Sequence, residues 1–345
     1  MNRSMDPLRL GLLSTANINA QILRGASETD RVDIVAVGSR DAAKAQAYAT
    51  EHGIERAHGS YEALLADDGV DAVYIGLPNG LHHEWALHAL AAGKHALVEK
   101  PYSRRAADAE QAFDAAEAAG LVLMEAFMYR HHPQTAVVRD LVVGGAIGRL
   151  QAVKTTFTFA LDDLTNVRAL PELDGGALMD VGCYCVSAIR LLAGEPERVA
   201  GEQVVGSTGV DMAFHGTVRC ADGVIGQFEA SFRSPRRQQI EAVGEEGTIT
   251  VEAPFRVDWG GTVLLARPEG EGLGRPEEVD VPEANAYRLE LDNLADAIQG
   301  RTPQLLGRDD AVAQARAIEA LYRAADEGRT VALAAPGQSG SDLPT

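Results

Sequence analysis

The sequence predicts two domains: an α/β domain with a parallel sheet, followed by a domain with an antiparallel or mixed sheet. The 345 residues exceed one average domain. Over residues 1–125, short apolar runs alternate with helical patterns, which is typical of βαβ units. The second domain, residues 126–334, contains a stretch from about 197 to 267 in which short strands are separated by glycine-rich turns. The small polar segment 335–345 is expected to be disordered.

The elements of the first domain follow in order. Its strands are expected at residues 8–13, 33–38, 72–75 and 95–98. Its helices are expected at residues 18–26, 41–52 and 82–92. Asp41 is a suitable N-cap, and Gly93 is a suitable stop signal.

The second domain shows a different pattern. Helices are expected at residues 133–143 and 176–192, and two more close the chain at 287–299 and 309–327. Between residues 197 and 267 the sequence reads as a series of short strands without long helices between them.

The composition excludes several classes of protein. There are 31 basic and 50 acidic residues, giving a net charge of −19, and such a surface repels nucleic acids. Three cysteines are too few for a disulfide scaffold, and we expect buried thiols. No apolar run approaches the roughly 20 residues of a membrane helix, and the start lacks a signal-peptide pattern. These features favour a cytoplasmic protein.

The first strand leads into a turn that suits a pyrophosphate. A strand, a small-residue turn and a helix N-terminus direct backbone N–H groups and the helix dipole at an anion. The glycine fingerprint itself is absent, since Ser14, Ala16 and Asn19 stand in its place. A plain strand-to-helix turn is the alternative interpretation.

The end of the second strand bears on cofactor choice. An acidic residue there would bind the ribose 2′-hydroxyl of NAD, but the sequence has Ser39 and Arg40. A hydroxyl and a guanidinium suit a 2′-phosphate, so we expect NADP, with NAD also possible. The alternative is a solvated arginine.

Three short motifs raise the specificity of the interpretation. They are Pro78-Asn79-Gly80-Leu81-His82, Ala92-Gly93-Lys94-His95 and Glu99-Lys100-Pro101. At this spacing they resemble the Gfo/Idh/MocA family of NAD(P)-dependent oxidoreductases. The segments 125–130, 175–184 and 240–251 resemble the family as well, so the likeness covers about residues 8–330.

The resemblance implies a Rossmann domain followed by a domain with a large, open, mostly antiparallel sheet. In the family this sheet commonly packs against another subunit, which implies a homodimer or homotetramer, and an exposed apolar sheet face would need covering. The turn at Ser14 and Ala16 resembles the branch of dimeric dihydrodiol and NADP-dependent xylose dehydrogenases. Tyr184 stands where inositol dehydrogenases carry histidine, which favours aldose, keto-sugar or dihydrodiol substrates.

The expected reaction transfers a hydride between nicotinamide C4 and a carbinol or carbonyl carbon of a sugar or polyol. Lys100 would hold the reacting oxygen, and Tyr184 would exchange its proton. Asp180, four residues earlier on one helical face, would orient Lys100 or bind a sugar hydroxyl. The alternatives are a solvated Lys100, a core Tyr184 and an Asp180 that serves only as an ion-pair partner.

Other residues receive assignments. Asn166 and Arg168 are candidates for substrate binding, and neighbouring residues 129–132 cannot form a metal site. Arg233, Arg236 and Arg237 could meet a diphosphate or form a solvated edge. The residues expected to contact the cofactor are Ser14, Thr15, Ala16, Asn17, Ile18, Ser39, Arg40, Leu77, Pro78, Asn79, His82, Glu99 and Lys100.

Rival functions remain open. An NAD-dependent glycoside hydrolase, a trans-dihydrodiol dehydrogenase, a sugar-nucleotide ketoreductase and a non-catalytic sensor are all compatible with the fold. The sensor is disfavoured because Lys100 is present. That residue also stands out because lysine occurs at only four positions: Lys44, Lys94, Lys100 and Lys154.

Overall fold

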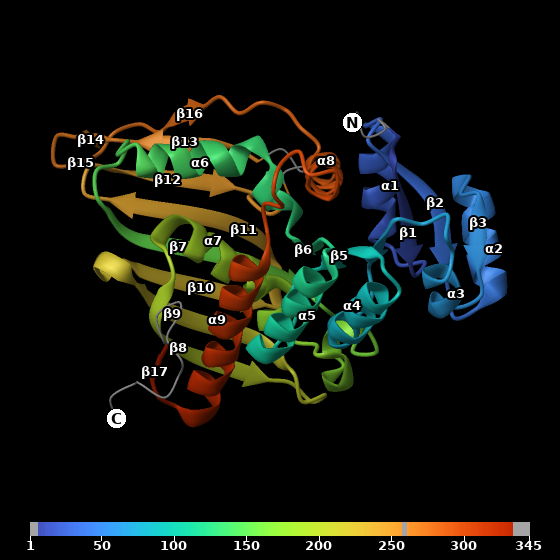
Figure 1. The fold of residues 1–345 in the computed structure, drawn as a ribbon. Coiled ribbons are helices and arrows are strands. Elements are labelled where there is room, and N and C mark those ends of the chain that lie inside the picture. Colours follow the sequence, from blue (N-terminus) through green and yellow to red (C-terminus); the bar gives the residue numbers. More distant parts are fainter. Residues whose placement is uncertain (1–5, 257–260, 334–345) are drawn as a thin grey trace. The chain divides into compact units, whose positions relative to one another are not determined.

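The structure is a computed structural model that describes residues 6–256 and 261–333 (Figure 1). The tail predicted at 335–345 lies outside these residues. The chain divides into two compact units. Among the described residues, the first comprises 6–103, 107–131 and 285–312, and the second comprises 104–106, 132–256, 261–284 and 313–333. The sequence analysis placed residues 285–312 in the second domain, whereas the structure places them in the first unit.

The sheet of the first unit is parallel throughout. Its strand order among the described residues is β3-β2-β1-β4-β5-β6, which reverses between β1 and β4 as in Rossmann folds. All four predicted strands are present, and β3 and β6 are additional. The bounds are β1 Leu8–Leu13, β2 Val32–Gly38, β3 Arg56–His58, β4 Ala72–Ile75, β5 His95–Glu99 and β6 Leu123–Ala126.

Helices connect these parallel strands. They are α1 Asn19–Ser27, α2 Ala42–His52, α3 Tyr61–Leu65, α4 His82–Ala91 and α5 Ala106–Ala119. Helix α8, Ala286–Ile298, returns from late in the chain and packs against α1. Gly25 permits this approach, because a Cβ atom there would lie 2.9 Å from the backbone carbon of Tyr287.

The sheet of the second unit is mixed and mostly antiparallel, as the resemblance implied. Its order among the described residues is β16-β13-β12-β11-β7-β10-β9-β8-β17, and of these pairs β7 and β10 run parallel. The short hairpin of β14 Pro268–Glu269 and β15 Gly272–Leu273 stands apart. The bounds of the sheet strands are β7 Leu150–Ala160, β8 Pro196–Val205, β9 Asp211–Cys220, β10 Ile225–Ser231, β11 Arg233–Gly244, β12 Gly247–Glu252, β13 Val263–Ala266, β16 Glu277–Val279 and β17 Val331–Ala332.

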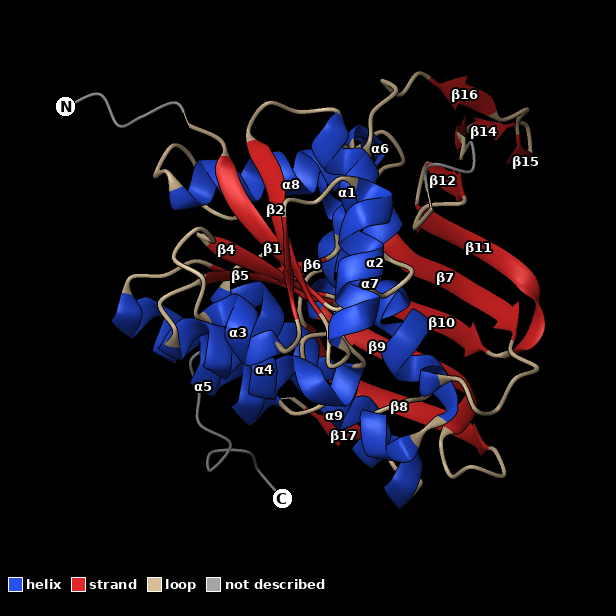
Figure 2. Ribbon diagram, turned by 90° about the vertical axis from the view of Figure 1, so that its right-hand side faces the viewer, coloured by secondary structure: helices blue, strands red, loops and turns tan. Residues whose placement is uncertain are grey.

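Helix α7, Cys183–Ala193, covers one face of this sheet and packs across β7 and β10 (Figure 2). Helix α6, Pro133–Val143, contacts α7, and α9 spans Arg308–Glu327. The predicted helix over 176–192 begins differently, since Leu178–Gly182 forms a π-turn before α7. Pro171–Ala193 is long and apolar enough to cross a membrane, contrary to the sequence expectation, but 83% of its apolar window is buried in the protein.

The opposite face of β7–β10 is polar. Outward positions on these strands carry Lys154, Glu202, His215, Thr217, Gln227 and Glu229, and they line a shallow hollow. The sequence analysis considered an apolar face in need of cover. The outward positions instead mix polar side chains with a few small or apolar ones, Ala200 and Val204 on β8 among them.

Candidate active-site residues in two units

The turn after β1 has a strained backbone that is held by hydrogen bonds. Ser14 adopts φ 124°, a conformation that favours glycine, and its hydroxyl donates to the Gly76 carbonyl at 3.1 Å. Asn19 donates from Nδ2 to the Ser14 carbonyl at 2.7 Å and so fixes the turn. Helix α1 begins after Ile18 without a side-chain cap. The N–H groups at the start of α1 face this turn, where the Ser14 hydroxyl accepts the Ala16 N–H at 3.3 Å.

The end of β2 presents Ser39 and Arg40. The Ser39 hydroxyl is buried and accepts the Asp41 N–H at 3.2 Å, while Arg40 is exposed. Asp41 caps α2 as predicted, accepting the N–H groups of Ala43 and Lys44 at 2.9 and 3.1 Å. Its carboxylate is thus committed to the helix.

The turn after β4 is fixed by His82. Leu77 and Pro78 lead into a single 3₁₀ turn, Asn79–Leu81, and His82 then opens α4 in a fully buried position. Its Nε2 lies 2.7 Å from the Leu77 carbonyl and its Nδ1 lies 2.9 Å from the Pro101 carbonyl. Burial lowers the pKa of His82 to about 4, so the neutral ring donates to one of these carbonyls at a time. His82 therefore joins this turn to the one that carries Lys100.

The end of β5 carries Glu99 and Lys100. Glu99 accepts the hydroxyl of the buried Tyr74 at 2.6 Å. Two residues after Lys100, the N–H of Tyr102 donates to the buried carboxylate of Glu125 at 2.7 Å. Glu125 lies on β6 and belongs to a segment that the sequence analysis recognised without assigning this role. It braces the backbone on the far side of Lys100 from β5.

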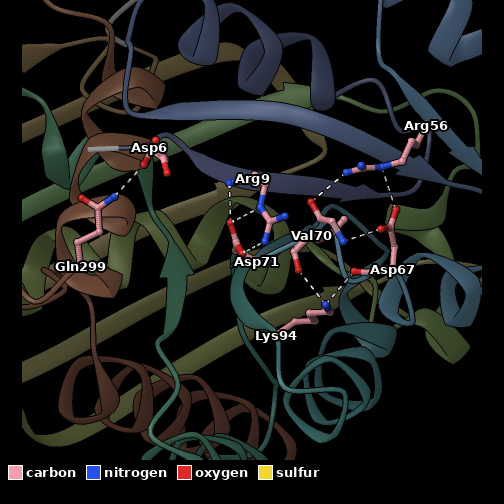
Figure 3. A network of polar contacts seen from close by, with 9 residues as sticks. Asp6, Arg9, Arg56, Asp67, Val70, Asp71, Lys94 and Gln299 are labelled. Carbon is pink, nitrogen blue, oxygen red and sulfur yellow. Dashed lines mark hydrogen bonds and ion pairs between the residues drawn. The ribbon is translucent and has the colours of Figure 1, made fainter. Parts of the chain in front are cut away.

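A second lysine of the motifs is structural. Lys94 is buried and donates from Nζ to the carbonyls of Asp67 and Val70 at 2.9 and 2.8 Å (Figure 3). The same network contains the Arg9–Asp71 and Arg56–Asp67 ion pairs. Lys94 thus holds the loop that enters β4, and its ammonium is directed away from solvent.

In the second unit, Asp180 lies on the π-turn that precedes α7. Its Oδ2 forms an ion pair with Arg168 Nε at 2.8 Å, and the Asp180 side chain is 12% exposed. Asn166 accepts the Arg168 N–H at 3.1 Å and lies 3.4 Å from its Nη1. The structure therefore joins three of the predicted residues in one chain of contacts. The wider turn of a π-helix also replaces the simple α-helical spacing that was assumed between Asp180 and Tyr184.

Tyr184 lies within an aromatic cluster. Its ring is 5.5 Å from Phe157 and 5.3 Å from Phe255 between centroids, and the residue is 6% exposed. This packing fixes the direction of the ring, which is what a proton-transferring phenol requires and also what a core aromatic shows.

The remaining candidates are placed as follows. His132 caps α6 and contacts the Ala284 carbonyl at 3.2 Å, while His131 is half-buried and desolvation lowers its pKa to about 3. Arg233, Arg236 and Arg237 are exposed on β11, and Arg237 pairs with Glu229 at 3.6 Å. All three cysteines are free and buried, as predicted.

Comparison with known families matches both units. Residues 9–127 match the oxidoreductase family with an NAD-binding Rossmann fold, and residues 135–250 match the GFO/IDH/MocA C-terminal domain. The chain belongs to the Gfo/Idh/MocA family of oxidoreductases. The resemblance drawn from the three short motifs is thereby confirmed.

Several members of this family are similar along the whole chain. D-xylose 1-dehydrogenase (NADP(+)) 2 of Haloferax volcanii is 39% identical over 94% of this chain and 100% of its own. The structure of aldose-aldose oxidoreductase from Caulobacter crescentus, complexed with glycerol, aligns with a TM-score of 0.86 at 27% identity, covering 95% of this chain and 100% of the other. A 3-ketoreductase from Actinomadura kijaniata, in complex with NADP and TDP-benzene, aligns with a TM-score of 0.86 at 28% identity, covering 92% and 98%.

Proposed function

We propose that this protein is an NADP-dependent oxidoreductase that interconverts a carbinol and a carbonyl group of a sugar or polyol. The likeness to an NADP-dependent xylose dehydrogenase over 94% of the chain supports the reaction class. The observation that carries the cofactor choice is the end of β2, where Arg40 is exposed and Asp41 is occupied in capping α2.

The residues of the first unit fit this cofactor. The uncapped start of α1 and the glycine-like turn at Ser14 suit the pyrophosphate, and Ser39 and Arg40 suit the 2′-phosphate. Thr15, Ala16, Asn17, Ile18, Leu77, Pro78, Asn79, His82 and Glu99 would line the rest of the cofactor site. When bound, the nicotinamide accepts or supplies the hydride.

Lys100 and Tyr184 would handle the proton. In the reductive direction the Tyr184 phenol would donate its proton to the carbonyl oxygen and become a phenolate, and in the oxidative direction that phenolate would take the hydroxyl proton as the carbonyl forms. The Lys100 ammonium donates a hydrogen bond to the reacting oxygen and stabilises its developing negative charge. Asp180, held by Arg168, would bind a substrate hydroxyl, with Asn166 beside it.

A matched pair of variants tests the cofactor assignment. Arg40→Ala should weaken NADP binding by about 10-fold or more, because a charge-assisted phosphate contact contributes about 1.5–3 kcal/mol. Its affinity for NAD should stay the same. Arg24→Ala, which removes an exposed arginine paired with Glu28 on α1, is the control. Equal loss of NADP and NAD affinity in Arg40→Ala would contradict the assignment.

A screen of aldoses, polyols, keto-sugars and dihydrodiols with both cofactors tests the reaction. We expect net NADPH formation or consumption with at least one sugar or polyol. Turnover of a glycoside without net change in the nicotinamide spectrum would instead indicate the hydrolase alternative. Turnover restricted to a sugar nucleotide would indicate the ketoreductase alternative.

We also propose that the polar face of β7–β10 mediates self-association into a homodimer or homotetramer in the cytoplasm. The outward side chains of four adjacent strands form one continuous hollowed face. Free, buried cysteines suit a reducing compartment. Light scattering of the protein, with Gln227→Arg as the interface variant, should show a multimer that the variant weakens. A monomeric wild type would contradict the proposal.

A further inference from the structure

Asp211 is a buried acidic residue outside the candidate site, at the first position of β9. It is 3% exposed, and its two oxygens accept from different elements. Oδ2 accepts the Leu178 N–H at 2.7 Å, and Oδ1 accepts the Tyr322 hydroxyl of α9 at 2.8 Å. Burial raises the pKa of Asp211 to about 6, while these two donors and Arg104 oppose that rise. Near neutral pH the carboxylate is therefore mostly ionised and accepts both bonds.

The hydrogen bond from Leu178 to Asp211 lies at the start of the π-turn that leads into α7. Leu178 opens the π-turn Leu178–Gly182, which contains Asp180, and Tyr184 follows in α7. The residue before this turn, Ala177, supplies no side-chain cap. A backbone N–H at a buried helix start needs an acceptor, and here that acceptor comes from another strand.

The backbone around Asp211 is built to admit its carboxylate. Gly176 has φ 126°, and a Cβ atom there would lie 2.1 Å from Asp211 Oδ1. Only glycine leaves room for the carboxylate at this position. The Gly176 carbonyl also accepts the Asp180 N–H at 3.0 Å, so Gly176 contributes a second contact to the turn that contains Asp180.

The second oxygen of the Asp211 carboxylate, Oδ1, is held by Tyr322. Tyr322 is fully buried, and the Arg104 guanidinium lies 3.7 Å from the centre of its ring. This cation over an aromatic face stabilises the position of Tyr322, whose hydroxyl then fixes Asp211. A chain of contacts therefore connects these residues: Arg104 lies over the Tyr322 ring, the Tyr322 hydroxyl donates to Asp211, and Asp211 accepts the Leu178 N–H.

We propose that Asp211 is a positioning residue, which caps the π-turn from β9 and thereby fixes the direction of Asp180 and Tyr184 for substrate. This role rests on the proposed function for its effect on turnover. The effect of Asp211 on the conformational order of residues 178–184 rests on the hydrogen-bond geometry alone. The two effects are measured separately.

Three variants test the turnover effect in the full-length protein. Asp211→Ala leaves the Leu178 N–H without an acceptor, and we expect kcat to fall about 10- to 100-fold, as small misplacements of reacting groups do. The affinity for NADPH should change less than about 3-fold. Asp211→Asn can accept from Leu178 and donate to the Tyr322 oxygen, so it should restore most of kcat. Tyr322→Phe keeps the Leu178 contact and removes the second donor to the carboxylate, so its kcat should fall, but by less than that of Asp211→Ala.

Hydrogen exchange tests the positioning without any substrate. Peptides covering residues 178–184 should exchange faster in Asp211→Ala than in Tyr322→Phe or the wild type. Unchanged exchange and unchanged kcat in Asp211→Ala would overturn the proposal, as would equal losses in Asp211→Asn and Asp211→Ala. Absence of sugar turnover in the wild type would refute the proposed function, and the exchange result would still decide the role of Asp211.

Asp211→Glu is the test variant to use if Asp211→Ala does not fold. Asp211→Glu keeps the negative charge but moves the carboxylate by one methylene group, so it cannot accept the Leu178 N–H from the same place. It should lose kcat as Asp211→Ala does. Wild-type kcat and wild-type exchange in folded Asp211→Glu would contradict a positioning role.

Discussion

Lys94 offers a direct test of the distinction between structural and catalytic lysines. Its ammonium is buried beside the loop that enters β4 and donates to two carbonyls, those of Asp67 and Val70. A hydrogen bond from a charged donor contributes about 1.5–3 kcal/mol, so the two together contribute about 3–6 kcal/mol. Lys94→Met keeps the length of the side chain and recovers part of this loss through apolar packing. We expect the free energy of unfolding to fall by about 2–4 kcal/mol.

Lys44→Met is the matched control, because Lys44 is exposed on α2. Its effect should lie within about 0.5 kcal/mol of zero. Urea unfolding of wild type and both variants, followed by circular dichroism, measures the difference. At a temperature where Lys94→Met is folded, its kcat should equal that of the wild type. Equal stability of the two variants, or a folded Lys94→Met with lost turnover, would refute the structural role.

Three further predictions concern individual contacts. Ser14→Gly should be more stable than Ser14→Ala by about 1 kcal/mol or more in urea unfolding, because φ 124° strains every residue but glycine; equal stabilities would contradict this. Glu290 is fully buried with no hydrogen-bond partner for either oxygen among the described residues, and burial together with Glu99 raises its pKa well above the ordinary value. The protonated Glu290 therefore contributes stability at low pH that is lost as the pH rises. The stability of Glu290→Gln relative to wild type should increase between pH 5 and pH 8. The same gap between the urea midpoints of the two proteins at both pH values would contradict this prediction. Arg168→Ala should raise the KM for the sugar about 10-fold, because it removes the ion pair that holds Asp180, and it should leave the affinity for NADPH unchanged. A changed affinity for NADPH would contradict the assignment of Arg168 to the substrate site.

Much of the first unit could be predicted because parallel strands buried on both faces read as continuous apolar runs. Strands β1, β2, β4 and β5 all gave this signal. Strand β3, Arg56–His58, has three half-buried residues and gave none. Strand β7 alternates buried and exposed residues over part of its length, a pattern that was present in the sequence but was not identified.

Long-range contacts could not be read from the sequence. The packing of α8 against α1 depends on Gly25, whose role appears only when Tyr287 is brought beside it. Likewise the Arg168–Asp180 ion pair and the contact of Asp211 with Leu178 join residues 12 and 33 positions apart. The motifs located the candidate residues, but the groups that hold them come from other elements.

Lys100 and Tyr184 are proposed to handle the proton when hydride moves to or from a sugar or polyol carbon. Once the screen identifies a substrate, the most direct measurement is single-turnover NADPH formation or consumption by wild type, Lys100→Ala and Tyr184→Phe. General acid–base catalysis contributes about 10²–10⁴-fold, so each variant should lose turnover in that range while still binding NADPH and unfolding like the wild type. Full turnover in both variants would contradict the account.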